Sequence, residues 1–260
     1  MKKDAIVIRE LSSPREFAET EEISKAAWRF PDRAVPPAAD LVAGTHAGGL
    51  TAGAFRGREM VGYVHGIPRT NVGQPCQHSH LLAVHPSAQG LGLAAKLKFF
   101  QRLWCLERGI RLVTWTYDPF LLKNARLNVG RLRATVRRLI PNLYGPLGGI
   151  YGELPTDRFE VTWRLDDPIV ERAAGGESSP AHAPEDDRIP VARGRKLPDA
   201  PRVALPFPAG APGIYRTDPA GSLRARKAFA RVALPLFESG YEVSGLMIGE
   251  SGPAYLLDRG

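Results

Sequence analysis

The chain has 260 residues, which is enough for one large domain, or for one domain and a smaller unit, with an ample core. A hydrophobic content of 43% and a charged content of 24% are ordinary for a soluble globular protein. The net charge of +8 favours an anionic ligand only weakly, because an excess of this size usually lies scattered over a solvated surface.

Cysteine usage and the opening residues both point to the cytoplasm. Cys76 and Cys105 form neither a disulfide framework nor a paired Cys-x-x-Cys metal spacing, which is typical of a reducing compartment. The first residues, MKKDAIVIRE, are acidic where a signal peptide has its apolar core, and no apolar run approaches the roughly 20 residues that cross a bilayer. We therefore expect a soluble cytoplasmic protein without a membrane partner.

Residues 1–165 predict a mixed α/β domain. It opens with a strand at 4–11 and a helix that has Ser13 as its N-cap and Pro14 at its first position. The pattern then predicts, in chain order, a short helix within 30–44, strands at 48–55, 60–67 and 76–86, a helix at 91–108, a strand at 110–119, a helix at 121–138 and a strand at 158–165. Such an order is typical of a sheet flanked by helices.

The rest of the chain predicts a linker and a small αβ extension. Residues 166–200 are rich in proline, glycine and charge, so we expect a linker or extended arm. Residues 201–260 predict three short strands and one helix, capped by Asp218 with Pro219 at its first position. A unit this small rarely supplies enough core to stand alone, so it should pack on the first domain or on that of a second subunit.

The strand at 76–86 leads through glycines into a helix. A glycine-rich turn at a helix start presents unpaired amides and the positive end of the helix dipole, which together hold phosphate oxygens. Gly90 and Gly92 let the backbone approach a pyrophosphate closely, and the Gln89 side chain can donate a hydrogen bond. The alternative interpretation is a plain strand-to-helix turn in which the glycines serve packing.

Two other phosphate motifs are excluded. No Gly-x-x-x-x-Gly-Lys followed by Ser or Thr occurs, and the glycines follow an antiparallel meander instead of the first strand of a βαβ unit. What remains is Gln-x-x-Gly-x-Ala, and with it LLAVHPSAQGLGLAAKLK resembles the central motif of the GNAT superfamily of acyl-CoA N-acyltransferases. The stretches LERGIRLVTWTYDPFLLKNARLN and PNLYG are further similar to a bacterial branch of that family with a C-terminal extension.

The resemblance implies a mostly antiparallel, splayed sheet and an acyl-CoA co-substrate, either acetyl-CoA or another acyl-CoA. The strands at 76–86 and 110–119 would part at their C-terminal ends, and the pantetheine arm would bond to backbone groups of Leu82, Ala83 and Val84. The amides expected to hold the pyrophosphate belong to Gln89, Gly90, Leu91, Gly92, Leu93 and Ala94.

Transfer of an acyl group to an amine needs a base for the ammonium and an acid for the departing thiolate. By alternation along the strand, His78, His80, Leu82 and Val84 should share one face. His78 falls where several family members have a carboxylate base, and an imidazole has a suitable pKa. His78 and His80 are therefore candidate bases; the alternative is polar lining or hydrogen-bonded core.

The acid is less well defined. Where many family members have a Leu-Tyr pair, this chain has Leu127 and Asn128, and an amide cannot donate the proton. Tyr144 is the best replacement by residue type and Tyr117 the second, with a packed core aromatic as the alternative for each. Asn124 would contact the pantetheine arm, as polar residues on this helix do in relatives.

The basic residues between 123 and 138 favour a solvated helix face; alternatively they, Lys96 or Lys98 meet the 3′-phosphate of the nucleotide or an acidic acyl group. No DNA-reading motif is present and aromatic residues are not interleaved with the basic ones, so no nucleic-acid partner is expected. His78 and His80 lack an obvious cysteine or carboxylate partner nearby, which predicts no metal site.

The leading hypothesis is an acyl-CoA-dependent N-acyltransferase. It would move an acetyl or related short acyl group, such as succinyl, to the amine of a small molecule or amino acid by direct attack in a ternary complex. The alternative is a non-catalytic acyl-CoA-binding or regulatory module, which Asn128 in place of tyrosine favours. The arm and the appended unit are also compatible with a homodimer formed by exchange.

Overall fold

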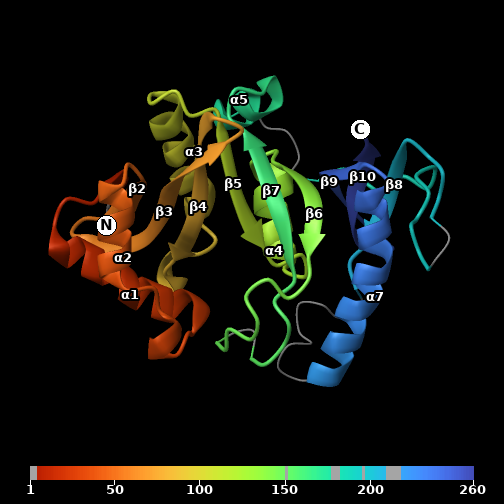
Figure 1. The fold of residues 1–260 in the computed structure, drawn as a ribbon, viewed down its shortest axis with the longest axis horizontal. Coiled ribbons are helices and arrows are strands. Elements are labelled where there is room, and N and C mark those ends of the chain that lie inside the picture. Colours follow the sequence, from red (N-terminus) through yellow and green to blue (C-terminus); the bar gives the residue numbers. More distant parts are fainter. Residues whose placement is uncertain (1–4, 150–151, 177–181, 195–196, 209–217) are drawn as a thin grey trace. The chain divides into compact units, whose positions relative to one another are not determined.

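A computed structural model describes residues 5–149, 152–176, 182–194, 197–208 and 218–260 (Figure 1). The chain divides into two compact units. Unit 1 comprises Met1–Trp115, Gly148–Ile150 and Arg164–Asp166, and unit 2 comprises Thr116–Leu147, Tyr151–Trp163 and Asp167–Gly260. The main division therefore lies at residue 116, whereas the sequence predicted a boundary near residue 165.

Unit 1 holds a mostly antiparallel sheet with helices. Its strands are β1 (Ile6–Glu10), β2 (Leu50–Arg56), β3 (Glu59–Asn71), β4 (Gln74–Val84) and β5 (Leu112–Tyr117), the last two residues of which belong to unit 2. Its helices are α1 (Pro14–Trp28), α2 (Ala38–His46) and α3 (Leu93–Leu106), with short turns η1 (Asp32–Ala34) and η2 (Pro86–Ala88). Neighbouring strands pair antiparallel from β1 to β4, and β4 pairs parallel with β5. The predicted mixed α/β fold is confirmed.

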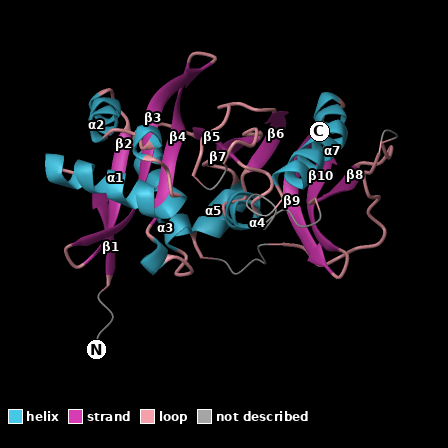
Figure 2. Cartoon of the chain, turned by 90° about the horizontal axis from the view of Figure 1, so that it is seen from below, coloured by secondary structure: helices cyan, strands magenta, loops and turns pink. Residues whose placement is uncertain are grey.

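Different helices cover the two faces of this sheet (Figure 2). A Cβ built on Gly44 of α2 would lie 2.9 Å from Cε1 of His65, so α2 packs on the face to which His65 points. A Cβ built on the next residue of β3, Gly66, would lie 2.8 Å from Nε2 of Gln101, so α3 covers the opposite face.

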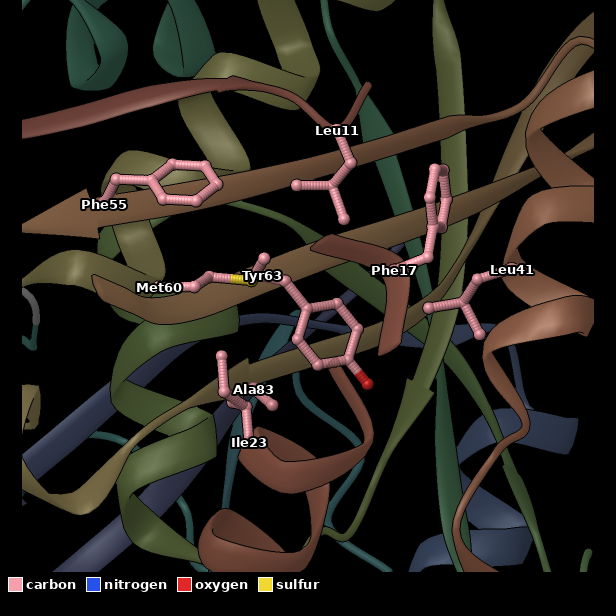
Figure 3. Close-up of a cluster of buried hydrophobic side chains, with 8 residues drawn as sticks. All are labelled: Leu11, Phe17, Ile23, Leu41, Phe55, Met60, Tyr63 and Ala83. Carbon is pink, nitrogen blue, oxygen red and sulfur yellow. The ribbon is translucent and has the colours of Figure 1, made fainter. Parts of the chain in front are cut away.

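The face under α1 and α2 carries a buried apolar cluster, shown in Figure 3. Its members come from both helices, from β2 to β4 and from the turn after β1: Leu11, Phe17, Ile23, Leu41, Phe55, Met60, Tyr63 and Ala83. The hydroxyl of Tyr63 lies 2.6 Å from Ser24 Oγ, so it has a hydrogen-bond partner within the core. Helix α1 begins as predicted, with the Ser13 hydroxyl accepting a hydrogen bond from the Glu16 amide at 3.4 Å.

Unit 2 is built on a second set of antiparallel strands. Its elements are α4 (Leu122–Ala125), the π-turn η3 (Arg126–Arg131), β6 (Thr135–Ile140), β7 (Arg158–Arg164), α5 (Pro168–Ala174), β8 (Arg202–Pro206), α7 (Pro219–Glu238), β9 (Tyr241–Gly249) and β10 (Gly252–Arg259). The strands pair in the order β7, β6, β9, β10, β8, and α7 packs on β6 and β9 (Figure 2). Helix α7 begins as predicted, because Asp218 accepts from the Gly221 amide at 2.7 Å.

The predicted helix at 121–138 is wrong in its second half. The helical turns end at Arg131, and the chain continues as β6, whose Val136 and Leu139 are buried. Arg138 pairs with Glu160 of β7 and Arg137 with Glu242 of β9. The basic residues therefore do not line one helix side, and sheet pairing overrides the local helical pattern.

The stretch at 166–200, expected as a linker, contains α5 and pairs with the sheet. Among its described residues, Ala183 bridges to Met247 of β9 and Val191 to Ala204 of β8. Ala192 is 1% exposed, so this segment contributes to the core of unit 2. In turn, β9 pairs with β6 at Val136 and Val243, so the C-terminal strands extend the sheet that β6 and β7 begin.

Candidate cofactor and acyl-transfer site

Strands β4 and β5 run parallel at the start of the candidate cleft. The described pairs between them are Gln77 with Val113 and His78 with Thr114. Directly after these pairs, the register of β4 against β3 shifts: Ser79 pairs with Gly66 and Leu81 with His65, which leaves His80 without a partner in β3. This is a β-bulge, and bulges of this kind are frequent beside active sites. Beyond these two pairs, the described residues of β4 and β5 form no further pairs, in agreement with the expected splay.

Because of the bulge, the prediction that His78 and Val84 share one face of the sheet is wrong. Ser79 lies opposite Gly66 and Val84 opposite Gly62, and Cβ atoms built on both glycines would approach side chains of α3. His78 instead pairs with Ile67, whose side chain faces α2. His78 and Val84 therefore lie on opposite faces, because the extra residue reverses the alternation.

Three imidazoles gather around the bulge. The ring centroids of His78 and His80 are 6.2 Å apart, and those of His65 and His80 are 6.4 Å apart. His65 is buried and lies 2.8 Å from Thr51 Oγ1, whereas His80 is exposed. His78 is half-buried, with Nδ1 3.4 Å from Thr114 Oγ1 of β5. The two predicted candidate bases are thus neighbours, and His65 is a third imidazole that the sequence analysis missed.

The surroundings favour neutral rings. Desolvation, followed by the nearby His80, lowers the pKa of His65 to about 4. Although His80 is exposed, the chain around it partly desolvates the ring and lowers its pKa below the ordinary value. A neutral imidazole with an accessible edge can accept a proton at neutral pH.

The glycine junction has the geometry that close backbone approach requires. Gly90 has φ of 81° and Gly92, the N-cap of α3, has φ of 68°, a left-handed conformation that favours glycine. A Cβ on either residue would meet no atom within 4 Å, so the space above the loop is open. No side chain caps α3, which leaves the first amides of the helix available to an anion.

The Gln89 side chain links the glycine turn to β4. Its Nε2 donates to the carbonyl of Val84 at 3.1 Å, which ties the loop to the end of β4. The His85 amide bonds to Val61 of β3 at 2.9 Å, so by alternation the backbone groups of Leu82 and Val84 point to the edge away from β3. The Val84 carbonyl is occupied by Gln89, whereas the Val84 amide points to the edge at which a ligand would bind.

The candidate residues Tyr117, Asn124 and Tyr144 belong to unit 2. Tyr144 is 46% exposed, and its hydroxyl lies 3.2 Å from Thr116 Oγ1. Tyr117 is buried against Phe159 and hydrogen-bonded to Tyr255, so the second candidate acid is a core aromatic. Asn124 is half-buried in α4.

Three further findings concern the expected phosphate contacts, metal sites and membrane spans. Lys98 is 1% exposed, so its ammonium is not available to the 3′-phosphate of a nucleotide. No group of three or more His, Cys, Asp and Glu side chains that could hold a metal occurs among the described residues. In the same part of the chain, no helix combines the length and the apolar character that crossing a membrane requires.

The acetyltransferase (GNAT) family matches residues 11–126 of the chain, which includes α1 to α3 and β2 to β5. No curated protein matches the sequence. Three solved structures share the fold at low identity.

The protein yncA of Salmonella typhimurium, solved with its cofactor acetyl-CoA, is 21% identical, with a TM-score of 0.51 over 63% of this chain and 95% of that one. The ribosomal-protein-S18-alanine N-acetyltransferase of Escherichia coli is 15% identical, with a TM-score of 0.51 over 63% and 96%. Ard1 of Thermoplasma volcanium is 15% identical, with a TM-score of 0.50 over 63% and 99%. Residues 11–126 thus match the acetyltransferase (GNAT) family, and the solved structures share its fold.

Proposed function

We propose that the chain is an acyl-CoA-dependent N-acyltransferase that transfers an acetyl or related short acyl group to the amine of a small molecule or amino acid. The observation that carries the proposal is the junction after β4, where a bulge beside His80 is followed by an open glycine turn at the start of α3. The match of residues 11–126 to the acetyltransferase (GNAT) family supports the reaction class, acyl transfer from acyl-CoA. The acceptor class rests on the resemblance described above.

The cofactor residues fit a pyrophosphate and a pantetheine arm. The amides of residues 90–94 would bind the pyrophosphate, because the turn is exposed and nothing stands where the Cβ atoms of Gly90 and Gly92 would be. The Gln89 amide, expected in the same group, instead donates to the Pro86 carbonyl at 3.3 Å. The outward backbone groups of Leu82 and Val84 would hold the arm, which Asn124 would contact. When bound, the cofactor supplies an activated thioester carbonyl, and the Val84 amide would polarise that carbonyl.

His80 is the proposed base. Its ring is exposed and its lowered pKa keeps it neutral, so it can take the proton of an acceptor ammonium, with His78 as the neighbouring imidazole. The free amine would then attack the carbonyl carbon, with the C–N bond forming as the C–S bond breaks. The new amide nitrogen would release its surplus proton to solvent, and the departing thiolate would take up one proton. Tyr144 is the proposed donor of that proton, on the grounds of its exposed hydroxyl.

A thiol-release assay tests the proposal. Acetyl-, succinyl- and longer acyl-CoA donors are incubated with the full chain and a pooled panel of small amines and amino acids, and free thiol is followed against time. We expect amine-dependent release with a short-chain donor. Coenzyme A binding without release from any donor would instead support the non-catalytic acyl-CoA-binding module, for which buried Asn128 in place of tyrosine is the favouring observation.

A further inference from the structure

Lys98 of α3 is buried beneath the candidate cleft. Its side chain is 1% exposed. A lysine is almost never buried to this extent unless its ammonium has partners. The Nζ atom donates to Ser79 Oγ at 2.9 Å and to Gln101 Oε1 at 2.7 Å. The same atom lies 3.7 Å from the ring centroid of Trp115, within cation–π distance. One ammonium thus contacts β4, α3 and β5 together.

The two strand residues that Lys98 contacts each lie one position beyond the last described pair of β4 and β5. Ser79 directly follows His78 in β4, and Trp115 directly follows Thr114 in β5. His78 and Thr114 form the last described pair between the two strands. Lys98 therefore reaches both strands one residue beyond their pairing, where β4 begins to bulge.

A buried hydrogen-bond network fixes the position of the ammonium. Ser79 Oγ, which accepts from Lys98, donates to Gln101 Oε1 at 3.0 Å. The amide of Gln101 donates to Gln77 Oε1, and the Cys105 thiol lies 3.5 Å from the same oxygen. The network is contiguous from α3 to β4 on both sides of the last strand pair, so movement of Lys98 would disturb each contact in turn.

We infer that Lys98 is a positioning residue of the acyl-CoA cleft: it joins Ser79 to Trp115 and thereby sets the point at which β4 and β5 separate. The bulge residue His80 follows Ser79 directly, so the same contact fixes the base relative to the cleft. This inference rests on the proposed function.

An apolar residue at position 98 would stabilise the fold at least as well as Lys98 does. Desolvation lowers the pKa of Lys98 to about 7, which reflects how unfavourable the charged form is at this site. Replacing a buried charge by an apolar side chain of similar volume is often neutral or stabilising. The directional contacts to two strands are what such a replacement would lose.

The test compares Lys98→Met and Ser79→Ala with the wild type. Lys227→Met is the matched control, because it makes the same change at an exposed position of α7. The readouts are melting temperature, coenzyme A affinity by calorimetry, kcat and KM for the acyl-CoA donor, and amide hydrogen exchange of residues 79–81 and 114–115 without ligand.

We expect Lys98→Met to melt at or above the wild-type temperature, to bind coenzyme A about tenfold more weakly, and to raise KM more than it lowers kcat. Amides of residues 79–81 should exchange faster, and Ser79→Ala should change exchange and affinity in the same direction. Even if Lys98→Met fails to fold, Ser79→Ala keeps the lysine and tests the contact to β4.

Wild-type exchange and affinity in both variants would overturn the positioning role while leaving the proposed function intact. Faster exchange in a protein whose wild type does not bind coenzyme A would mean that Lys98 sets the strand separation but that the proposed function is wrong.

Discussion

His80 is the histidine at the bulge whose ring reaches solvent. His65, 6.4 Å from it, is buried beside Thr51, and His78 is half-buried beside Thr114 of β5. His80 is the better candidate for the base, because its side chain is exposed and its lowered pKa keeps the ring neutral.

Replacing both His78 and His80 by alanine should lower turnover about 100-fold, the usual scale for loss of general base catalysis. Coenzyme A affinity should change little, because neither ring belongs to the loop at 89–94. The measurements are steady-state thiol release and calorimetry, with His182→Ala in unit 2 as the control. Near-normal turnover of the double variant would assign both rings to the lining.

His65 should make stability depend on pH. Its pKa is lowered to about 4 by burial, so between pH 6.5 and 4 the unfolded chain binds more protons than the folded one. Stability is therefore lost as pH falls through this window, by up to about 3 kcal/mol for a shift of this size. Denaturant unfolding of His65→Asn at pH 7 and 4.5 should show a smaller loss than the wild type; equal losses would contradict the assignment.

At the scale of elements, α7 is tied to the strand β5–α4 connection by buried charge. Arg226 Nη2 of α7 lies 3.1 Å from Asp118 Oδ2, and Arg158 of β7 lies 3.8 Å from the same oxygen. The Asp118 carboxylate also accepts from the Phe120 amide at 2.8 Å. Loss of this carboxylate would leave two buried guanidinium groups with Asp157, 3.6 Å from Arg226 Nη1, as the remaining carboxylate of the cluster.

Asp118→Ala should therefore reduce the free energy of unfolding by about 3–5 kcal/mol, the usual effect of breaking a buried ion pair from one side. Asp186→Ala, which removes a solvent-exposed pair with Arg188, should change it far less. Urea unfolding of both variants measures the difference. Equal, small effects would show that Asp118 is not central to this packing.

Elements with local signals could be predicted from the sequence, and those set by distant pairing could not. Ser13 and Asp218 mark their helices because a cap depends on the next three residues alone. By contrast, β6 forms where Val136 meets Val243 of β9, and the helical pattern at 121–138 carries no trace of that partner.

The same distinction holds in the site. The glycine turn was predictable, because a left-handed backbone conformation, which Gly90 and Gly92 adopt, favours glycine over other residues. The bulge at His80 arises from the register of β4 against β3, so regular alternation placed His78 and Val84 on one face wrongly. The role of Lys98 depends on Trp115 and Ser79, which only the fold brings together.

At the scale of the whole molecule, the C-terminal residues complete the core of unit 2. Phe159 of β7 is fully buried, and its ring lies 5.9 Å from Phe229, 5.6 Å from Phe237 and 5.0 Å from Tyr255. A chain that ends at Asp167 would lose those three rings together with β9, the partner of β6.

That truncation should expose apolar surface and lose solubility. Size-exclusion chromatography measures this loss. A monodisperse truncated protein would contradict the role of α7, β9 and β10 in the core of unit 2.

The most direct measurement is a calorimetric titration of coenzyme A into the wild type and two glycine variants. Gly92→Val and Gly109→Val both place a β-branched residue at a left-handed position with open space around it, at the start and after the end of α3. Backbone strain is therefore matched, and only the first variant alters the proposed pyrophosphate loop. We expect the wild type and Gly109→Val to bind coenzyme A and a folded Gly92→Val to show no binding. Unchanged affinity in folded Gly92→Val, or no binding by the wild type, would contradict the proposed acyl-CoA site.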